Sequence, residues 1–196
     1  MRGLFNGSKT LFIHVNNAKE ITQAVNFIVD FGIVKTVIVG GADSWMVTDI
    51  LKKNNIAVVL RRIHRLPSRP GDDIDLPYRI PFLLKEAGVL FCLENSGGME
   101  AMGTRNLPFY AGTAATYGLS KEEALMAITS NTAKILGIDK TVGTIEVGKD
   151  ATLIVSTGDA LDVLTNNIEL AYIRGKAIDL NNHQKTLYEK FRKKYE

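Results

Sequence analysis

The chain has 196 residues, of which 45% are hydrophobic and 23% are charged, and its net charge is +3. This length allows one sizeable core, and the composition is ordinary for a globular protein. No apolar run reaches the ~18 residues that a membrane-spanning helix needs. The positive charge is too small to indicate a nucleic-acid groove. We therefore expect neither a membrane nor a nucleic acid as a partner.

The chain starts with MRGLFNGSKTLFIHV, which lacks the apolar segment of a secretory signal. The compartment is therefore unknown, with the cytoplasm as the default, and a longer parent protein could still be exported. Cys92 is the only cysteine, so no internal disulfide can form. It lies in the apolar run VLFCL, and we expect it to be buried.

The first two thirds of the chain alternate continuous apolar runs with amphipathic segments. The apolar runs predict buried strands, and apolar residues spaced by three and four predict helices. The predicted strands are residues 10–15, 34–41, 56–62 and 88–94, and the predicted helices are residues 18–31, 44–55, 77–87 with a start near Pro81, 106–117 and 120–135. This alternation indicates βαβ units and a parallel sheet that is buried on both faces.

After Gly137 the pattern changes. Glycines separate the short β-like runs TIEV, ATLIVS and LAYIRGKAI, which predict antiparallel hairpins. The chain ends in KTLYEKFRKKYE, which predicts a helix from about Leu180 onward. Its apolar residues share one face of that helix, so we expect Tyr188, Phe191 and Tyr195 to dock on the body of the protein.

One long segment resembles a known family. Residues 129–155 read TSNTAKILGIDKTVGTIEVGKDATLIV, and a hairpin and the run YIRGK follow them. This order resembles the C-terminal end of the metal-dependent amidohydrolases, in their imidazolonepropionase-like branch. The matching positions are Asn131, Leu136, Gly137 and residues 143–149, whereas Thr152 stands where the family usually has an acidic residue. The resemblance extends back to about residue 10.

The resemblance implies an α/β fold that is the C-terminal half of a (β/α)8 amidohydrolase barrel, with part of the accompanying β-sandwich. Residues 1–140 would hold strands five to eight of the barrel with their helices. Residues 141–180 would be a segment of the β-sandwich, and residues 181–196 a C-terminal helix. Function must still be argued from the site, because one fold serves many functions.

Hydrolysis in this family needs a divalent metal, which lowers the pKa of a bound water to ~7. The family places a His-x-His pair on strand one, one His each on strands five and six, and an Asp at the end of strand eight. Strand one is absent from this chain. His14 fits the strand-five ligand, so the resemblance assigns it as the metal ligand of this chain.

The other expected ligands are replaced. Gly40 or Gly41 stands where strand six should carry a His, and residues 95–96 (Asn-Ser) stand where strand eight should carry an Asp. Glu94 is adjacent, and strand alternation would point it to the opposite face unless the strand end bulges. A catalytic zinc needs about three protein ligands. We therefore expect no cofactor in this chain, although the parent family uses zinc or another divalent metal.

Two loops carry further candidates. His64 follows the third predicted strand in RRIHR, and with Arg61 it is our candidate for binding a substrate. The turn GGAD before Ser44 resembles a weak phosphate-binding turn, but we expect Asp43 or Ser44 simply to cap the helix that begins at Trp45. No catalytic residue can be assigned.

Several functions remain open. The chain could be an amidohydrolase-like fragment that is inactive alone, or a hydrolase completed by a separate N-terminal chain. It could also be a non-catalytic small-molecule-binding protein with a degenerate pocket. The replacements at strands six and eight favour this last hypothesis over the completed hydrolase. A flavodoxin-like domain fits the βαβ pattern, but the hairpins after Gly143 argue against it.

Half a barrel would leave two open sheet edges and an uncovered apolar inner face, both of which favour association. We therefore expect a homo-oligomer, most simply a symmetric dimer, or an N-terminal half as the partner. A flat, doubly wound sheet covered on both faces would need no partner.

Overall fold

The computed structural model describes residues 1–97 and 99–195. Its main element is a parallel sheet of four strands in the order β1-β2-β3-β4, as the sequence predicts. The strands are β1 (Leu11–Val15), β2 (Thr36–Gly40), β3 (Ala57–Leu60) and β4 (Phe91–Leu93). The helices of this part are α1 (Arg2–Phe5), α2 (Ala18–Phe31), η1 (Ser44–Met46), α3 (Thr48–Lys53), α4 (Leu76–Ala87), α5 (Glu100–Gly103), η2 (Thr104–Asn106), α6 (Leu107–Thr116), α7 (Lys121–Ile128) and α8 (Ser130–Leu136).

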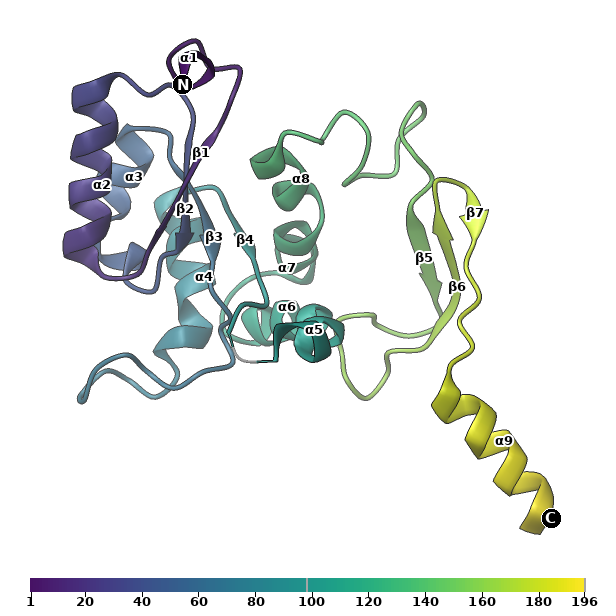
Figure 1. The fold of residues 1–196 in the computed structure, drawn as a ribbon. Helices are drawn as coiled ribbons and strands as arrows, with labels where there is room; N and C mark the ends of the chain where they lie inside the picture. Colours follow the sequence, from purple (N-terminus) through teal and green to yellow (C-terminus); the bar gives the residue numbers. More distant parts are fainter. Residues whose placement is uncertain (98, 196) are drawn as a thin grey trace.

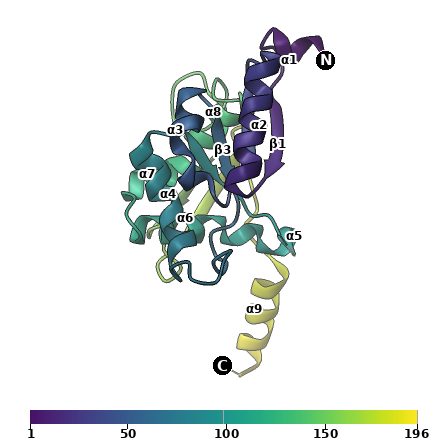
Figure 2. The same ribbon diagram turned by 90° about the vertical axis from the view of Figure 1, so that its left-hand side faces the viewer.

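One face of the sheet packs against helices (Figures 1 and 2). Helix α2 begins at its N-cap Asn17, whose side chain accepts from the Glu20 backbone, and it ends at Gly32 in the left-handed conformation. The main core lies between this face and the helices, with Ile38 and Val58 fully buried. Every second strand residue points into this core, which leaves the others for the opposite face.

The opposite face corresponds to the inside of a barrel. Phe12 and His14 of β1 are exposed there. Ile135 of α8, however, packs on the buried side chains of Val37 and Cys92. The expectation of a wholly uncovered inner face is therefore wrong for β2 to β4, because α8 folds over part of that face.

Three predicted helices differ from those observed. The helix predicted over 44–55 is divided at Val47 into η1 and α3. Helix α4 begins at Leu76 and contains Pro81 in its interior, so the predicted start near Pro81 is too late. The predicted helix over 120–135 is broken at Thr129, where φ is −128° and ψ is −91°. The break separates α7 from α8 and allows α8 to turn onto the inner face.

A second sheet holds β5 (Leu153–Ser156), β6 (Ile168–Ile173) and β7 (Lys176–Ala177), paired antiparallel as predicted. The run TIEV forms no strand in the described structure. This part meets the helical layer at Leu161, whose carbonyl group occupies the place that a Cβ atom at Gly112 would need. Glycine therefore allows the loop of Leu161 to lie directly on α6.

Helix α9 (His183–Tyr195) extends away from both sheets (Figures 1 and 2). It has no buried residue, and Tyr188, Phe191 and Tyr195 are 64%, 49% and 80% exposed. The prediction that these aromatic residues dock on the body is therefore wrong. None of the described helices is both long and apolar enough to cross a membrane.

Candidate functional site

The candidate residues lie near the carboxyl end of the parallel sheet, the end at which parallel α/β folds place their sites. His14 lies next to Val39 in the register of β1 and β2. Alternation puts His14 on the inner face with Val39, Val59 and Cys92, and its side chain is exposed. The assignment of His14 as a metal ligand stays a prediction.

The end of β2 leaves no room for a ligand. Gly40 has φ of +101°, and a Cβ atom there would lie 2.7 Å from Oδ1 of Asn16 and 2.9 Å from the carbonyl oxygen of Val15. A Cβ atom at Gly41 would lie 2.8 Å from Cγ1 of Val58. Any side chain at either glycine therefore requires the backbone or its neighbours to shift.

The end of β4 differs from the prediction. The backbone N–H of Glu94 donates to the carbonyl of Leu60 at 3.0 Å, so strand pairing continues one residue beyond β4. Alternation then turns Glu94 to the inner face with Cys92, so its predicted opposite orientation is wrong. Oε1 of Glu94 accepts from the Ser96 hydroxyl at 2.6 Å, while Oδ1 of Asn95 accepts from the Tyr110 hydroxyl of α6 at 2.8 Å. The Asn95 side chain therefore binds to α6 in the helical layer.

The residues present do not fit a catalytic divalent metal. Within residues 1–97 and 99–195, no group of three or more His, Cys, Asp and Glu side chains is placed to hold a metal ion. His14 and Glu94 share the inner face with Cys92. Burial raises the pKa of the Cys92 thiol to about 11, so the thiol is protonated at neutral pH and does not count as a third ligand. Two donors fall short of the three that a catalytic zinc requires.

Arginines occupy the segment that follows β3. The backbone N–H of Arg61 donates to the carbonyl of Gly40 at 2.9 Å, which extends the strand by one residue, and strand alternation then turns Arg61 to the inner face. Nη2 of Arg62 would lie 3.3 Å from a Cβ atom at Gly97, so this guanidinium lies against the glycine loop after β4. Nε of Arg65 is buried without a hydrogen-bond partner in the described structure. Burial and then the charge of Arg61 lower the pKa of Arg65.

Asp43 braces this arginine segment instead of capping η1. Its carboxylate, 5% exposed, receives both terminal nitrogens of Arg69 at 2.6 and 3.2 Å and the backbone N–H of Ala18 at 3.2 Å. No cap hydrogen bond to η1 is made by Asp43, and the hydroxyl of Ser44 is buried without a partner among the described residues. The prediction that Asp43 or Ser44 caps this helix is therefore wrong, because the Asp43 carboxylate is bound to the Arg69 guanidinium.

His64 lies on the helical side of the sheet. Its Nε2 is 2.7 Å from the Thr113 hydroxyl of α6, and its ring lies edge-on to Tyr110 at 4.5 Å and to Tyr78 of α4 at 6.0 Å. Burial and then the charge of Arg62 lower the pKa of His64, so it is neutral at pH 7. Strand alternation turns Arg61 to the inner side, so the two predicted substrate-binding residues lie on different sides of the sheet.

A hollow lies beside His64, between α6 and the loop before β6. We call it the α6 groove; its volume is about 720 Å³ and its apolar lining includes Phe109, Leu119, Leu161 and Val163, with Asp159 and Asp162 at its edge. Lys121 pairs with Asp159 at 2.7 Å. This groove could not be predicted from the sequence, because it forms only where the loop of Leu161 lies on α6.

Comparison with known proteins shows which family and which solved structures the chain resembles. The model of the amidohydrolase family matches residues 85–178. An amidohydrolase structure from Thermotoga maritima MSB8 is 28% identical, with a TM-score of 0.79 over 91% of this chain and 45% of its own. A zinc-bound adenosine deaminase from Xanthomonas campestris is 19% identical, with a TM-score of 0.64 over 98% of this chain and 52% of its own.

A Xaa-Pro dipeptidase is 18% identical, with a TM-score of 0.67 over 89% of this chain and 46% of its own. None of the curated protein sequences matches the chain. The chain therefore spans about half the length of the solved structures that it resembles. It has the fold of a partial (β/α)8 barrel with an antiparallel sheet, and it resembles the C-terminal portion of a metal-dependent amidohydrolase.

Proposed function

We propose that this chain is the C-terminal half of an amidohydrolase-like protein and has no metal-dependent hydrolase activity by itself. The parent class hydrolyses non-peptide or cyclic C–N bonds, and the signature in residues 129–155 favours its imidazolonepropionase-like branch. The coverage of about half of each similar structure supports the first part of the proposal. The incomplete set of metal ligands supports the second part.

The observation that carries the proposal is the end of β2. A missing N-terminal half could supply the absent strand-one ligands, but it could not change Gly40 or Gly41. Neighbouring atoms enclose both glycines, so an imidazole at either position requires the backbone or the neighbouring side chains to shift. The strand-six ligand is therefore lost from the chain itself.

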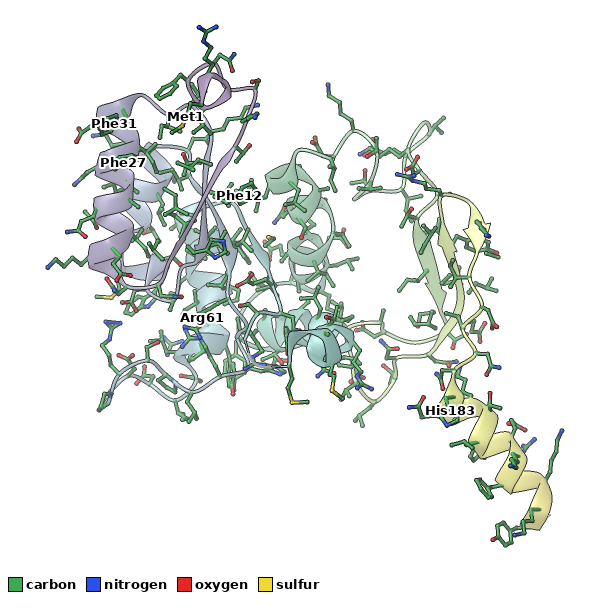
Figure 3. The ribbon with its side chains drawn as sticks, in the orientation of Figure 1. Met1, Phe12, Phe27, Phe31, Arg61 and His183 are labelled. Carbon is green, nitrogen blue, oxygen red and sulfur yellow. The ribbon has the colours of Figure 1, made fainter. Side chains whose placement is uncertain are left out.

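The test is an assay of the purified chain against cyclic amides and dipeptides with added zinc or manganese. We expect no turnover above the uncatalysed rate. His14→Ala should behave as the unmodified chain does, and His183→Ala on the exposed helix α9 is the matched control (Figure 3). Metal-dependent turnover that disappears in His14→Ala and persists in His183→Ala would contradict the proposal.

A second candidate is a non-catalytic protein that binds a small anionic molecule at the same end of the sheet. The arginine segment favours it, because Arg61 and Arg62 form no ion pair among the residues that the structure describes. A guanidinium fork suits carboxylate and phosphate groups. Citrate and phosphate should then raise the melting temperature, and Arg61→Gln should reduce that shift. Arg174→Gln, at an 80% exposed side chain, is the control.

A hydrolase completed by a separate N-terminal chain is the third candidate. Glu94 on the inner face favours it, because a carboxylate there could join His14 and two further ligands. The enclosed glycines at the end of β2 disfavour it. In this candidate, an N-terminal half or a second copy covers the edge of the sheet at β1, where Phe12 is 39% exposed. Co-expression with an N-terminal half would restore zinc-dependent turnover only if this candidate holds.

A further inference from the structure

Helix α9 has an apolar face that is not buried in the described structure, and the centres of its aromatic rings lie 5.5–5.9 Å from basic groups of the same helix. Leu187, Tyr188, Phe191 and Tyr195 follow one another at helical spacing, and basic residues lie on both sides of this stripe. We call these four residues the α9 stripe. Three of them are between 49% and 80% exposed, as given above for the aromatic side chains.

The charge of the protein is concentrated in the same helix. Residues 183–196 contain five Lys and Arg residues and two Glu residues, which together account for the whole net charge of +3. The rest of the chain is therefore neutral overall. Two copies of α9 would repel each other, so a helix pair of α9 with α9 is unfavourable.

Helix α9 also needs a partner for its own stability. Isolated helices shorter than about 12–15 residues are marginal in water, and α9 has 13 residues. Its Glu189–Arg192 ion pair, at 2.9 Å, contributes little at the surface. Packing of the α9 stripe on another surface would supply the missing stabilisation.

The α6 groove offers the matching surface. Its apolar lining includes Phe109 and Leu161, and the neighbouring Val163 is 68% exposed. Asp162 at its edge accepts from the Leu164 backbone and the Thr165 hydroxyl and forms no ion pair among the described residues, while Asp159 pairs with Lys121. The groove edge therefore carries two carboxylates and one ammonium group, and this excess of negative charge on an apolar groove complements an aromatic stripe flanked by lysines.

We propose that the α9 stripe of one molecule docks in the α6 groove of a second copy. Residues 178–182 lead α9 away from its own body, which favours another molecule over its own groove (Figures 1 and 2). Exchange in both directions gives a symmetric dimer with two identical contacts. This inference does not depend on the chemistry at the carboxyl end of the sheet.

The test is the dimer dissociation constant from sedimentation velocity, supported by hydrogen exchange of α9. Phe191→Ala should weaken the dimer about tenfold or more, as loss of a central aromatic anchor does. Phe31→Ala removes an aromatic side chain that is 59% exposed on α2, and it should leave the constant unchanged. High salt should weaken the wild-type dimer.

Val163→Arg changes the groove and should also dissociate the dimer, since it adds a like charge opposite α9. A mixture of the Phe191→Ala and Val163→Arg chains retains one intact helix and one intact groove, so it should form a heterodimer with a single contact. The melting temperature of each variant, measured at a concentration at which the chain is monomeric, shows whether the variant is folded.

Three results would overturn the proposal. A wild-type chain that stays monomeric with unprotected α9 amides would show that α9 has no partner in solution. A monomer whose α9 protection is lost in Val163→Arg would place α9 in its own groove. A dimer that is unaffected by both variants would place the contact on another surface.

Discussion

Replacing Asp43 by Ala should destabilise the protein more than any other single loss of an ion pair described above. The Asp43 carboxylate is 5% exposed and joins Arg69 of the arginine segment to the first turn of α2 through Ala18. Its removal frees the segment after β3 and leaves the Ala18 N–H without its acceptor. The change therefore tests whether Asp43 holds this end of the sheet together.

The magnitude follows from the contacts. A hydrogen bond to a charged group contributes about 1.5–3 kcal/mol. The side chain of Arg69 is 44% exposed, so solvent screening reduces its share. We expect a total loss of about 2–3 kcal/mol, which corresponds to a fall of roughly 4–12 °C in the melting temperature of a chain of this size.

The assay is thermal or urea unfolding of Asp43→Ala, Arg69→Gln and the double variant. The coupling energy between Asp43 and Arg69 should be about 1–2 kcal/mol. Asp73→Ala is the matched control, because its side chain is 73% exposed and pairs with Arg79, and it should cost less than about 1 kcal/mol. If Asp43→Ala costs no more than Asp73→Ala, the bracing role is refuted.

Three further outcomes are expected. Burial raises the pKa of Cys92 to about 11 from 9.0, so the native protein should hold about 100-fold less thiolate than a free cysteine; alkylation at pH 8 as fast as in urea would contradict this. Burial and Arg62 lower the pKa of His64, so stability should fall as the pH drops below about 6.5, and His64→Gln should remove that fall in pH-dependent unfolding. Deleting residues 183–196 should leave the melting temperature of the dilute monomer unchanged, because α9 buries no residue, and a clear decrease would show that it does dock on its own body.

The parallel sheet could be predicted because its signals are local. Continuous apolar runs predict β1 to β4, and apolar residues at helical spacing predict α2, in which Ile21, Val25 and Ile28 are buried. Each of these signals comes from residues that are close in the sequence and does not depend on distant packing.

The arrangement of the site could not be predicted in the same way. The orientation of Glu94 depends on one hydrogen bond to Leu60 of the neighbouring strand, and a shift of one residue reverses the face of a side chain. The position of α8 depends on the break at Thr129, which no local signal marks. The α6 groove depends on a loop about 50 residues further along the chain than α6.

The aromatic residues of α9 show what an amphipathic pattern cannot predict. An amphipathic pattern predicts that a helix has an apolar face, but not which surface covers that face. The helix is present as predicted, whereas the prediction that Tyr188 and Phe191 dock on the body of the protein is wrong, because both are exposed.

The most direct test of the proposed incomplete metal site is a calorimetric titration of the purified chain with zinc. We expect no tight binding of one zinc per chain, and the same weak heats for the unmodified chain, His14→Ala and the control His183→Ala. Tight binding of one zinc that is lost in both His14→Ala and Glu94→Gln, but kept in His183→Ala, would show a complete site on the inner face. That result would contradict the account.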